Sequence, residues 1–219
     1  MSRYTILVDM DEVLANFSKT FGVEYISKFC QTRSSRQVVS WPERKHWKVR
    51  DDYPEKYRAD IDSIYDRVGF YKTLETMQGA KSAIIALKKK YNIYIVTSLR
   101  KENLTCYEDK AWWLETHIGT DFSRLMIPCS DKTIIWGHML IDDNPNPRLG
   151  GANPHPYWTH IVFDQPWNRD VKGPRIKNNW SNAEEVIEKV LKDRERREMI
   201  KCRGFGDYDD DIVDAVFFG

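Results

Sequence analysis

The chain has no large excess of charge of either sign, few cysteines and no long apolar run. Its 219 residues include 34 Lys and Arg against 33 Asp and Glu, for a formal net charge of +1. General binding to nucleic acid or to a membrane surface relies on a basic excess, so this balance counts against both kinds of partner. No apolar run approaches the roughly 20 residues that span a bilayer, so we expect no membrane segment.

The four cysteines are far apart and form no CxxC pair: Cys30, Cys106, Cys129 and Cys202. This spacing does not suggest tetrahedral zinc and does not imply disulfides. A strand-like run begins almost at the first residue, so a signal peptide is not expected. We therefore expect a cytoplasmic protein in a reducing compartment.

Strand-like and helix-like segments alternate along most of the chain. The strand-like segments are 4–8, 92–96, 124–127, 139–141 and 161–163, and the helix-like segments are 14–29, 80–90, 107–118 and 183–200. This alternation predicts an α/β protein with a mainly parallel, Rossmann-like sheet in three α/β/α layers, with helices on both faces.

Aromatic and charged residues concentrate between residues 31 and 74, which indicates a separate, mostly helical insertion. We predict a core of residues 1–16 and 76–203, an inserted unit of residues 17–75, and a C-terminal tail of residues 204–219. The tail is acidic and then apolar, and it could pack on the core or on a second copy of the chain. A homodimer is therefore left open.

Acidic pairs follow two of the expected strands. Asp9 and Asp11 come directly after residues 4–8, and Asp142 and Asp143 come after residues 139–141. Open α/β sheets bind ligands at the carboxyl ends of their strands. Grouped carboxylates repel one another unless a cation neutralises them, so these pairs predict a hard, oxygen-seeking metal, most plausibly Mg²⁺.

Two further segments have side chains suited to phosphate. Thr97 and Ser98 end the strand-like segment 92–96, where hydroxyl and backbone N–H groups can donate to phosphate oxygens. Lys132 stands just ahead of another apolar stretch. Taken alone, the hydroxyls are typical of a turn or cap and the lysine of a solvated surface charge. Their order relative to the acidic pairs makes the signal specific.

That order resembles the four-motif signature of the haloacid dehalogenase (HAD) superfamily of phosphotransferases. Residues 9–17, 96–98, 131–133 and 140–143 are closer still to the 5′(3′)-deoxyribonucleotidases, and the likeness runs from about residue 4 to about residue 165. It implies a HAD-like core in which residues 17–75 form a small helical cap over the site. Relatives commonly have Gly at the position of Glu12 and an acid at that of Asn16. The extra Glu12 carboxylate must point away from the metal or be paired.

The resemblance implies roles for the two acidic motifs. Asp9 would be the nucleophile that forms an aspartyl-phosphate, and Asp11 the general acid and base. Asp9, Asp142 and Asp143 would hold Mg²⁺, together with the backbone carbonyl of Asp11. Which of Asp142 and Asp143 binds the metal directly is left open.

The resemblance also implies the phosphate contacts and the substrate. Thr97 and Ser98 would donate to the transferring phosphoryl oxygens, with Lys132 supplying positive charge opposite the metal. The substrate would be a nucleoside monophosphate, with deoxyribose preferred over ribose.

Cap aromatics would form the substrate pocket. Phe17 matches a residue that lines the sugar and base, Tyr65 lies where relatives have an aromatic that stacks on the base, and Trp47 falls in the same aromatic region. The alternative for each is an ordinary core residue of the cap. Arg100 and Lys101, just past the Thr-Ser pair, could guide an anionic substrate or be solvated surface charges.

Three other functions remain open. Two are HAD phosphatases acting on another small phosphate monoester or on a nucleic-acid 3′-phosphate, although the near-neutral charge counts against a polynucleotide. The third is a catalytically silent nucleotide-binding module, which would normally have lost Asp9, Asp11 or Lys132. The sequence does not give the base preference or the choice between 5′- and 3′-phosphates.

Overall fold

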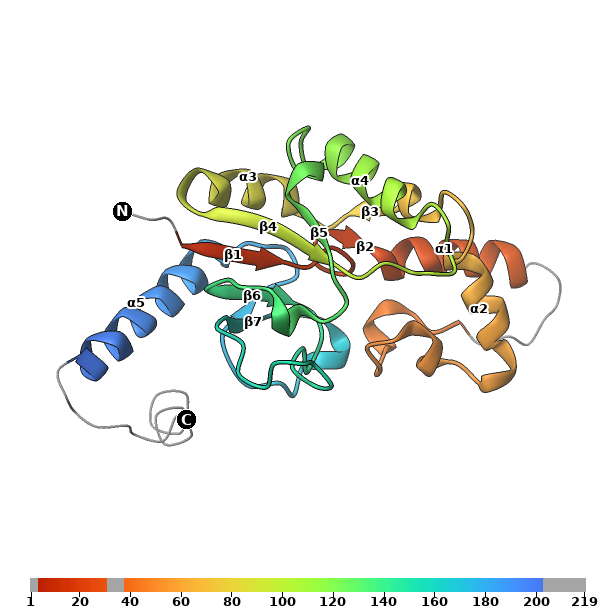
Figure 1. The fold of residues 1–219 in the computed structure, drawn as a ribbon. Helices are drawn as coiled ribbons and strands as arrows, with labels where there is room; N and C mark the ends of the chain where they lie inside the picture. The colour runs from red at the N-terminus through yellow and green to blue at the C-terminus, as the bar shows by residue number, and fades with distance from the viewer. Residues whose placement is uncertain (1–3, 31–37, 203–219) are drawn as a thin grey trace.

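A computed structural model describes residues 4–30 and 38–202, including side chains through residue 200 (Figure 1). The helices are α1 (Phe17–Phe29), α2 (Arg58–Tyr65), α3 (Ala80–Lys90), α4 (Cys106–His117) and α5 (Ala183–Cys202). The strands are β1 (Thr5–Val8), β2 (Ala15–Asn16), β3 (Glu75–Thr76), β4 (Asn92–Thr97), β5 (Met126–Pro128), β6 (Met139–Asp142), β7 (Thr159–Phe163) and β8 (Arg175–Ile176). Short 3-10 helices occur at Trp41–Glu43, Val49–Asp52, Glu55–Tyr57, Phe70–Thr73, Ser123–Leu125, Lys132–Ile134 and Pro166–Asn168. The predicted tail lies outside the described residues.

Six strands form the central sheet in the order β5-β4-β1-β6-β7-β8, and every neighbouring pair is parallel. The mainly parallel sheet predicted from the sequence is therefore confirmed. In register, Val8 pairs with Ile95 on one side and with Ile141 on the other. The carboxyl ends of β1, β4 and β6 consequently meet at one edge, which faces α1 and α2 in Figure 1.

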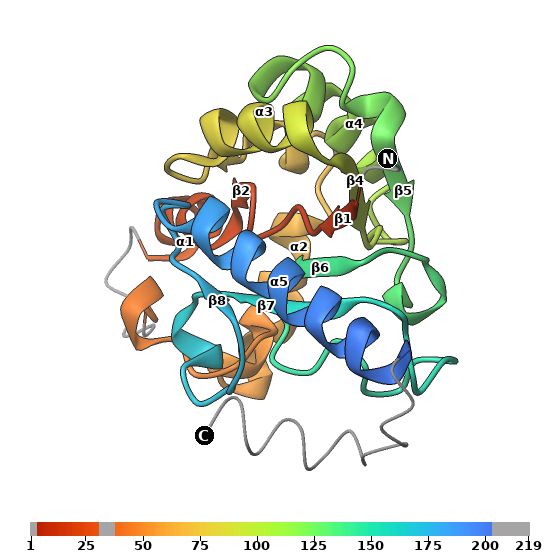
Figure 2. The ribbon, with the colours of Figure 1, turned by 90° about the vertical axis from the view of Figure 1, so that its left-hand side faces the viewer.

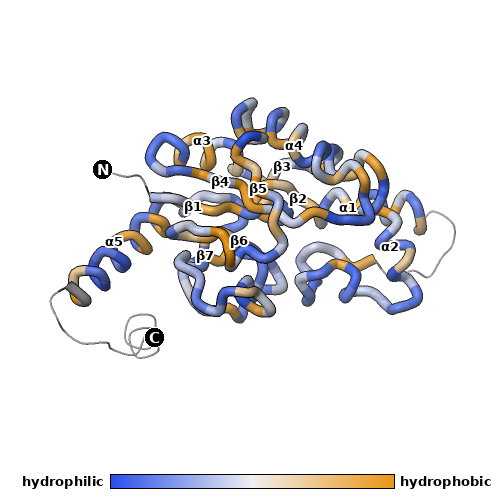
Figure 3. Tube along the Cα trace, viewed as in Figure 1, coloured by the Kyte–Doolittle hydropathy of each residue, from blue (hydrophilic) through white to orange (hydrophobic). Residues whose placement is uncertain are grey.

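Two apolar clusters sandwich the sheet in a three-layer α/β arrangement. Ile6 and Val8 of β1 belong to the larger cluster, which also contains the buried apolar residues of α3, α4 and α5. Leu7 points to the other face and packs with Trp158 and partly buried Ile135. That third layer consists of loops and 3-10 turns. Figure 2 looks at the molecule from the side where α5 lies in front of the sheet, and Figure 3 shows the apolar strands at its centre.

The segment between β1 and α3 leaves the sheet and returns to it. β2 and β3 pair antiparallel, Ala15 with Thr76 and Asn16 with Glu75, so the two ends of this segment lie side by side. Between them, α1, α2 and the short 3-10 helices stand beyond the carboxyl edge of the sheet (Figure 1). The domain boundaries at residues 16/17 and 75/76 stay a prediction.

The sequence misplaced some boundaries. A helix was expected from residue 14, but α1 begins at Phe17 because the Asn16 side chain caps it by accepting the Lys19 N–H at 3.1 Å. The expected strand at 124–127 begins instead at Met126, after a 3-10 turn. Residues 166–179 fall in none of the segments expected from the sequence, yet they contribute β8 at the sheet edge. Within the described residues, no helix is long and apolar enough to cross a membrane.

Candidate active site

Side chains from three strands meet in a cavity of about 380 Å³ at the carboxyl edge of the sheet. Asp9 follows β1, Thr97 ends β4 and Asp142 ends β6, so the parallel register brings together residues far apart in the sequence. Its remaining lining includes Asp11, Ser98, Lys132 and Asp143 from the core, with Phe17, Trp47 and Tyr65 from the inserted segment. The catalytic, phosphate-binding, metal-binding and aromatic candidates from the sequence therefore all line one cavity, whereas Lys101 does not.

Three buried carboxylates form a cluster suited to a cation. Oxygens of Asp9, Asp142 and Asp143 all lie within 4.8 Å of one another. Lys132 Nζ lies 2.6 Å from Asp9 Oδ1 and 2.7 Å from Asp142 Oδ2. Burial lowers the pKa of Lys132, but the two aspartates outweigh it and raise that pKa above its ordinary value. The lysine is therefore a fixed positive charge.

Among the described residues, no cationic side chain forms an ion pair with Asp143, and the charge of Lys132 lowers the pKa of Asp143 only as the smallest of the causes. Its Oδ2 accepts the Trp167 indole N–H at 3.1 Å. Burial, followed by repulsion from Asp142 and Asp9, raises the pKa of Asp143 well above its ordinary value. Asp142, in contrast, is bonded to Lys132 through Oδ2 and to the Asn144 N–H through Oδ1. Asp143 is the carboxylate with most to gain from a bound cation.

A second buried lysine organises the other half of the site. Lys110 Nζ on α4 donates to Asp11 Oδ2 at 2.7 Å, to Thr97 Oγ1 at 2.8 Å and to the Ser98 carbonyl at 2.9 Å. Burial raises the pKa of Asp11, and Lys110 opposes that rise. Asp11 Oδ1 is buried and has no hydrogen-bond partner among the described residues. The carboxyl group is thus held on one side and available for proton exchange on the other.

Lys110 was missed by the sequence reasoning, although a signal was present. It lies four residues after Cys106 and three before Trp113, both of which are buried on α4. A lysine on the apolar face of a helix is rarely buried without a partner. That position alone could have marked it as a candidate for pairing with an acid of the site.

Glu12 was expected either to point away from the metal or to be paired. In the structure it is buried and paired. It has a φ of 61°, a left-handed backbone conformation in which glycine is strain-free. Its Oε1 accepts the Ser18 N–H at 2.9 Å and also bonds the Ser18 hydroxyl. Arg44 Nη1, from the inserted segment, lies 3.1 Å from the same oxygen. The carboxylate is therefore paired with Arg44, and its negative charge still adds to the causes that raise the pKa of Asp143.

Arg44 connects several parts of the site. It also pairs with Asp52 through Nε at 3.1 Å, and its guanidinium stacks 4.0 Å from the ring of Trp167. Trp167 is the residue that donates to Asp143. The inserted segment is thereby in contact with the neighbourhood of the acidic cluster.

The three aromatic candidates surround the apolar end of the cavity. Phe17 packs 5.7 Å from the ring of Tyr65 and is partly buried. The Tyr65 hydroxyl donates to Asp62. Trp47 is 43% exposed and lines the cavity without a ring contact to either. Phe17 and Tyr65 thus form a packed wall, and Trp47 lies at the rim.

The two basic residues after the Thr-Ser pair differ in position. Arg100 lines the cavity, but its guanidinium is held by Asp66 at 2.6 Å and by Glu102 at 3.1 Å. Lys101 is 89% exposed and lies outside the cavity lining. Neither has a cationic group directed at the acidic cluster.

Comparison with known proteins identifies the family. The model of the family described as 5′ nucleotidase, deoxy (pyrimidine), cytosolic type C matches residues 3–194. The chain belongs to this family. Its members are 5′-nucleotidases, which are phosphoric monoester hydrolases.

Individual relatives agree with the family match. A protein of Bordetella pertussis provisionally named a 5′(3′)-deoxyribonucleotidase is 35% identical over 183 residues, covering 81% of this chain and 94% of that protein. The mitochondrial 5′(3′)-deoxyribonucleotidase of Mus musculus is 35% identical over 191 residues, covering 83% and 84%. The cytosolic enzyme of Homo sapiens is 30% identical over 193 residues, covering 84% and 92%. Because both compartments occur among relatives, the expected cytoplasmic location stays a prediction.

Solved structures confirm the fold. A HAD-family hydrolase from Deinococcus radiodurans superposes with a TM-score of 0.54 at 10% identity, covering 86% of this chain and 96% of that one. That protein was solved with phosphate and sodium bound. At this identity the likeness concerns the fold, and it confirms the HAD-like architecture predicted from the motifs.

Proposed function

We propose that the protein is a Mg²⁺-dependent 5′(3′)-deoxyribonucleotidase that hydrolyses deoxyribonucleoside monophosphates to nucleoside and phosphate. The observation that carries the proposal is the group of aspartates at the carboxyl edge of the sheet. Asp9 is placed beside Lys132, Asp142 and Asp143, with Asp11 held on the adjacent side by Lys110. The names of the relatives supply the substrate class.

The acidic cluster fits a small divalent cation. Its donors are buried carboxylate oxygens, the ligands that Mg²⁺ prefers. The cluster of Asp9, Asp142 and Asp143 faces one lysine, Lys132, which leaves an excess of two negative charges that one divalent ion would balance. Asp9 and Asp143 would hold it directly, with Asp142 kept in place by Lys132. When bound, Mg²⁺ would neutralise charge between the anionic nucleophile and the anionic phosphate.

The reaction proceeds in two displacements. A carboxylate oxygen of Asp9 attacks phosphorus, forming an aspartyl-phosphate while the ester P–O bond breaks. Asp11, whose raised pKa favours its protonated form, gives its proton to the leaving alkoxide. Asp11 then takes a proton from a water molecule, which attacks the phosphoryl group and releases phosphate from Asp9. Thr97, Ser98 and Lys132 stabilise the transferring oxygens.

Sugar selectivity is assigned to the aromatic wall. A 2′-hydroxyl placed against the ring faces of Phe17 and Tyr65 would lose water without gaining an acceptor from those rings. An unsatisfied buried hydroxyl costs roughly 1–3 kcal/mol, which corresponds to about a five- to more than hundredfold difference in kcat/KM.

The test is a panel of deoxyribo- and ribonucleoside 5′-, 3′- and 2′-monophosphates assayed with and without Mg²⁺. We expect matched deoxy substrates to be favoured by at least about fivefold. Phe17→Ser should narrow that ratio without changing the Mg²⁺ requirement, and Val23→Ser, an exposed position on the same helix, serves as the control. Equal kcat/KM for matched sugars would contradict the substrate assignment, and full activity in a chelator would contradict the metal site.

A further inference from the structure

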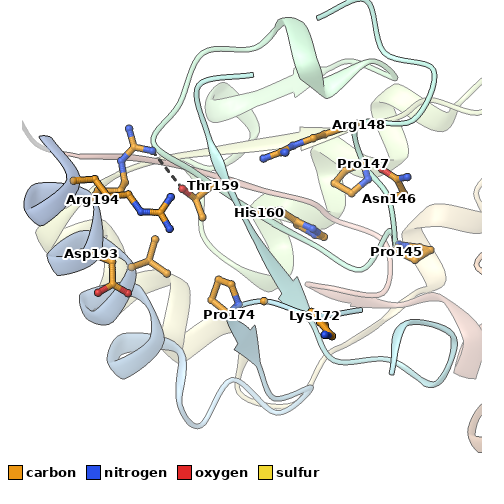
Figure 4. Close-up of a pocket in the computed structure, with 13 residues that line it drawn as sticks. Pro145, Asn146, Pro147, Arg148, Thr159, His160, Lys172, Pro174, Asp193 and Arg194 are labelled. Carbon is orange, nitrogen blue, oxygen red and sulfur yellow. Dashed lines mark hydrogen bonds between the residues drawn. The ribbon is translucent and has the colours of Figure 1, made fainter. Parts of the chain in front are cut away.

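A second cavity, of about 520 Å³, lies outside the active site, between α5 and the loop that follows β6 (Figure 4). Its volume falls within the range of about 300–1,000 Å³ typical of small-molecule sites. Apolar walls come from Pro145, Pro174 and Val190. The cavity is partly open to solvent, and its apolar walls offer a surface for the body of a small molecule.

The lining of this cavity is strongly basic. Arg148, Lys172, Arg194 and Arg197 contribute cations, whereas Asp193 is the one carboxylate among the lining residues. Arg148 and Lys172 are exposed, whereas Arg194 and Arg197 are half-buried, and like charges gathered around one space favour a bound counter-charge.

Two arginines of this cavity contact aromatic rings of the chain, Arg148 at 5.7 Å from Trp158 and Arg194 at 4.6 Å from Tyr157. In the described part of the chain no carboxylate forms an ion pair with Arg148, Lys172 or Arg194. Arg194 donates through Nη1 to the Tyr157 carbonyl at 3.2 Å and to Thr159 Oγ1 at 3.3 Å. Its Nε is buried, with no hydrogen-bond partner among the described residues. A buried guanidinium N–H left unbonded is costly, so an anion that draws this side chain toward the cavity would relieve that cost.

Two connections lead from this cavity to the acidic cluster. His160, in the cavity lining, lies with Nε2 3.2 Å from the backbone carbonyl of Asp142. Along the loop, Asp142 Oδ1 accepts the Asn144 N–H at 2.8 Å, and Asn144 Oδ1 accepts the Asn146 N–H at 2.9 Å. Asn146 lines the basic cavity. Asp142 is therefore bonded both to Lys132 in the active site and to groups that border the second cavity.

We propose that this basic cavity is a regulatory site for a compound with several adjacent phosphoryl groups, either a nucleoside triphosphate or free polyphosphate. Four cationic residues and one carboxylate line the cavity. This excess of positive charge suits a ligand with more negative charge than a single phosphate monoester carries. Occupancy would reposition the loop of residues 143–148 and thereby alter how tightly the acidic cluster holds its cation. By linkage, the active-site cation and the cavity ligand would change each other's affinity by the same factor.

Binding is tested first, by titration calorimetry on the full chain in metal-free buffer. The probes are inorganic tripolyphosphate and ATP, which distinguish a site that reads only phosphoryl groups from one that also holds a nucleoside. Arg148→Gln/Lys172→Gln should weaken binding at least about tenfold. The matched control, Lys89→Gln/Arg124→Gln, removes the same charge from two exposed positions outside the cavity and should stay within about twofold of the unmodified protein. Equal weakening in the two double variants, or no binding to the unmodified chain, would overturn the site.

Coupling is tested by activity on a chromogenic phosphate monoester at fixed free Mg²⁺ concentrations. The probe that binds should shift the Mg²⁺ concentration for half-maximal rate by about fivefold or more in the unmodified protein. Arg148→Gln/Lys172→Gln should keep its basal rate within about twofold and lose the shift. A probe effect of the same size in this variant would place the anion in the active site and overturn the proposal. Binding at the cavity without any change in Mg²⁺ response would overturn the coupling to Asp142.

Discussion

Two buried clusters of charge lie next to each other in this molecule, and they are balanced in opposite ways. At the catalytic edge, four aspartates face two lysines, and the pKa of Asp143 is raised by burial and by its acidic neighbours. In the cluster around Arg44, Asp52 is also little exposed, yet hydrogen bonds from Lys45, His46 and Arg44 overcome burial and hold its pKa below the ordinary value. The same residue type is thus destabilised in one cluster and stabilised in the other.

The difference in charge balance distinguishes a catalytic cluster from a structural one. A buried site left with excess negative charge requires a cation from outside, which is what a metal-dependent phosphatase needs. In the Arg44 cluster the chain supplies its own cation: the pKa of Asp52 is lowered, while burial raises the pKa of Glu12 to about 7 against the opposing charge of Arg44. The comparison predicts that variants of the first cluster lose activity and keep the fold, whereas variants of the second lose stability.

The largest effect is expected for Asp9→Asn. The amide is a poor nucleophile and a poor Mg²⁺ ligand, so phosphatase turnover should fall by about 10⁴-fold or more, to the background of the assay. The protein should remain folded by circular dichroism. Appreciable turnover in this variant, with contamination excluded, would defeat the aspartyl-phosphate mechanism.

Arg44→Met tests the balanced cluster. It leaves Glu12 buried without its cation, so the free energy of unfolding should fall by about 3–5 kcal/mol in urea titrations. In Arg44→Met/Glu12→Gln, a neutral amide replaces the buried carboxylate. A substantial part of the lost free energy of unfolding should then be recovered. Additive losses in the double variant would show that the two side chains are not coupled, and the comparison would then break at this cluster.

How far these clusters could be predicted from the sequence follows from their geometry. Asp9, Thr97 and Asp142 each end or directly follow a strand, so recognising three parallel strands is enough to place them together. The partner lysine and arginine are different. Lys110 contacts a residue 99 positions away, and Arg44 contacts one 32 positions away. Lys110 lies on a helix and Arg44 follows a 3-10 helix, so the tendency of ligands to bind at the carboxyl ends of strands does not locate them.

The elements of the fold also differ in how far the sequence alone predicts them. Strands β1, β4 and β6 were predictable because each is a continuous apolar run. The two-residue strand β8 has no such run, and its place at the sheet edge depends on backbone pairing with Val162 and Phe163. The early start predicted for α1 failed because the capping role of Asn16 depends on how β2 pairs with β3.

Asp143→Asn and Asp52→Asn provide a direct contrast between the clusters. The folded-state pKa of Asp143 is raised, so its ionised form costs stability above the ordinary aspartate pKa, and the asparagine variant should be more stable than the unmodified protein at pH 7 in metal-free buffer. The pKa of Asp52 is lowered, so its ionised form adds stability above the ordinary aspartate pKa, and its replacement should cost about 1–3 kcal/mol. Changes of the same sign would contradict the difference in balance. With Mg²⁺ present, Asp143→Asn should also need at least about 100-fold more metal for half-maximal activity.

Lys110→Met gives the smallest and most specific effect. The variant keeps every carboxylate of the site but releases Asp11, so kcat should fall by about tenfold, a part of the 10²–10⁴ that general acid–base catalysis supplies. Because Lys110 opposes the burial that raises the pKa of Asp11, its removal should move the limbs of the pH–rate profile that depend on Asp11 to higher pH. Lys110→Arg, which keeps the positive charge, should restore the profile more fully than it restores kcat. A fall in kcat with an unmoved profile would mean that Lys110 only supports the packing of α4, and Asp11 would then titrate independently of it.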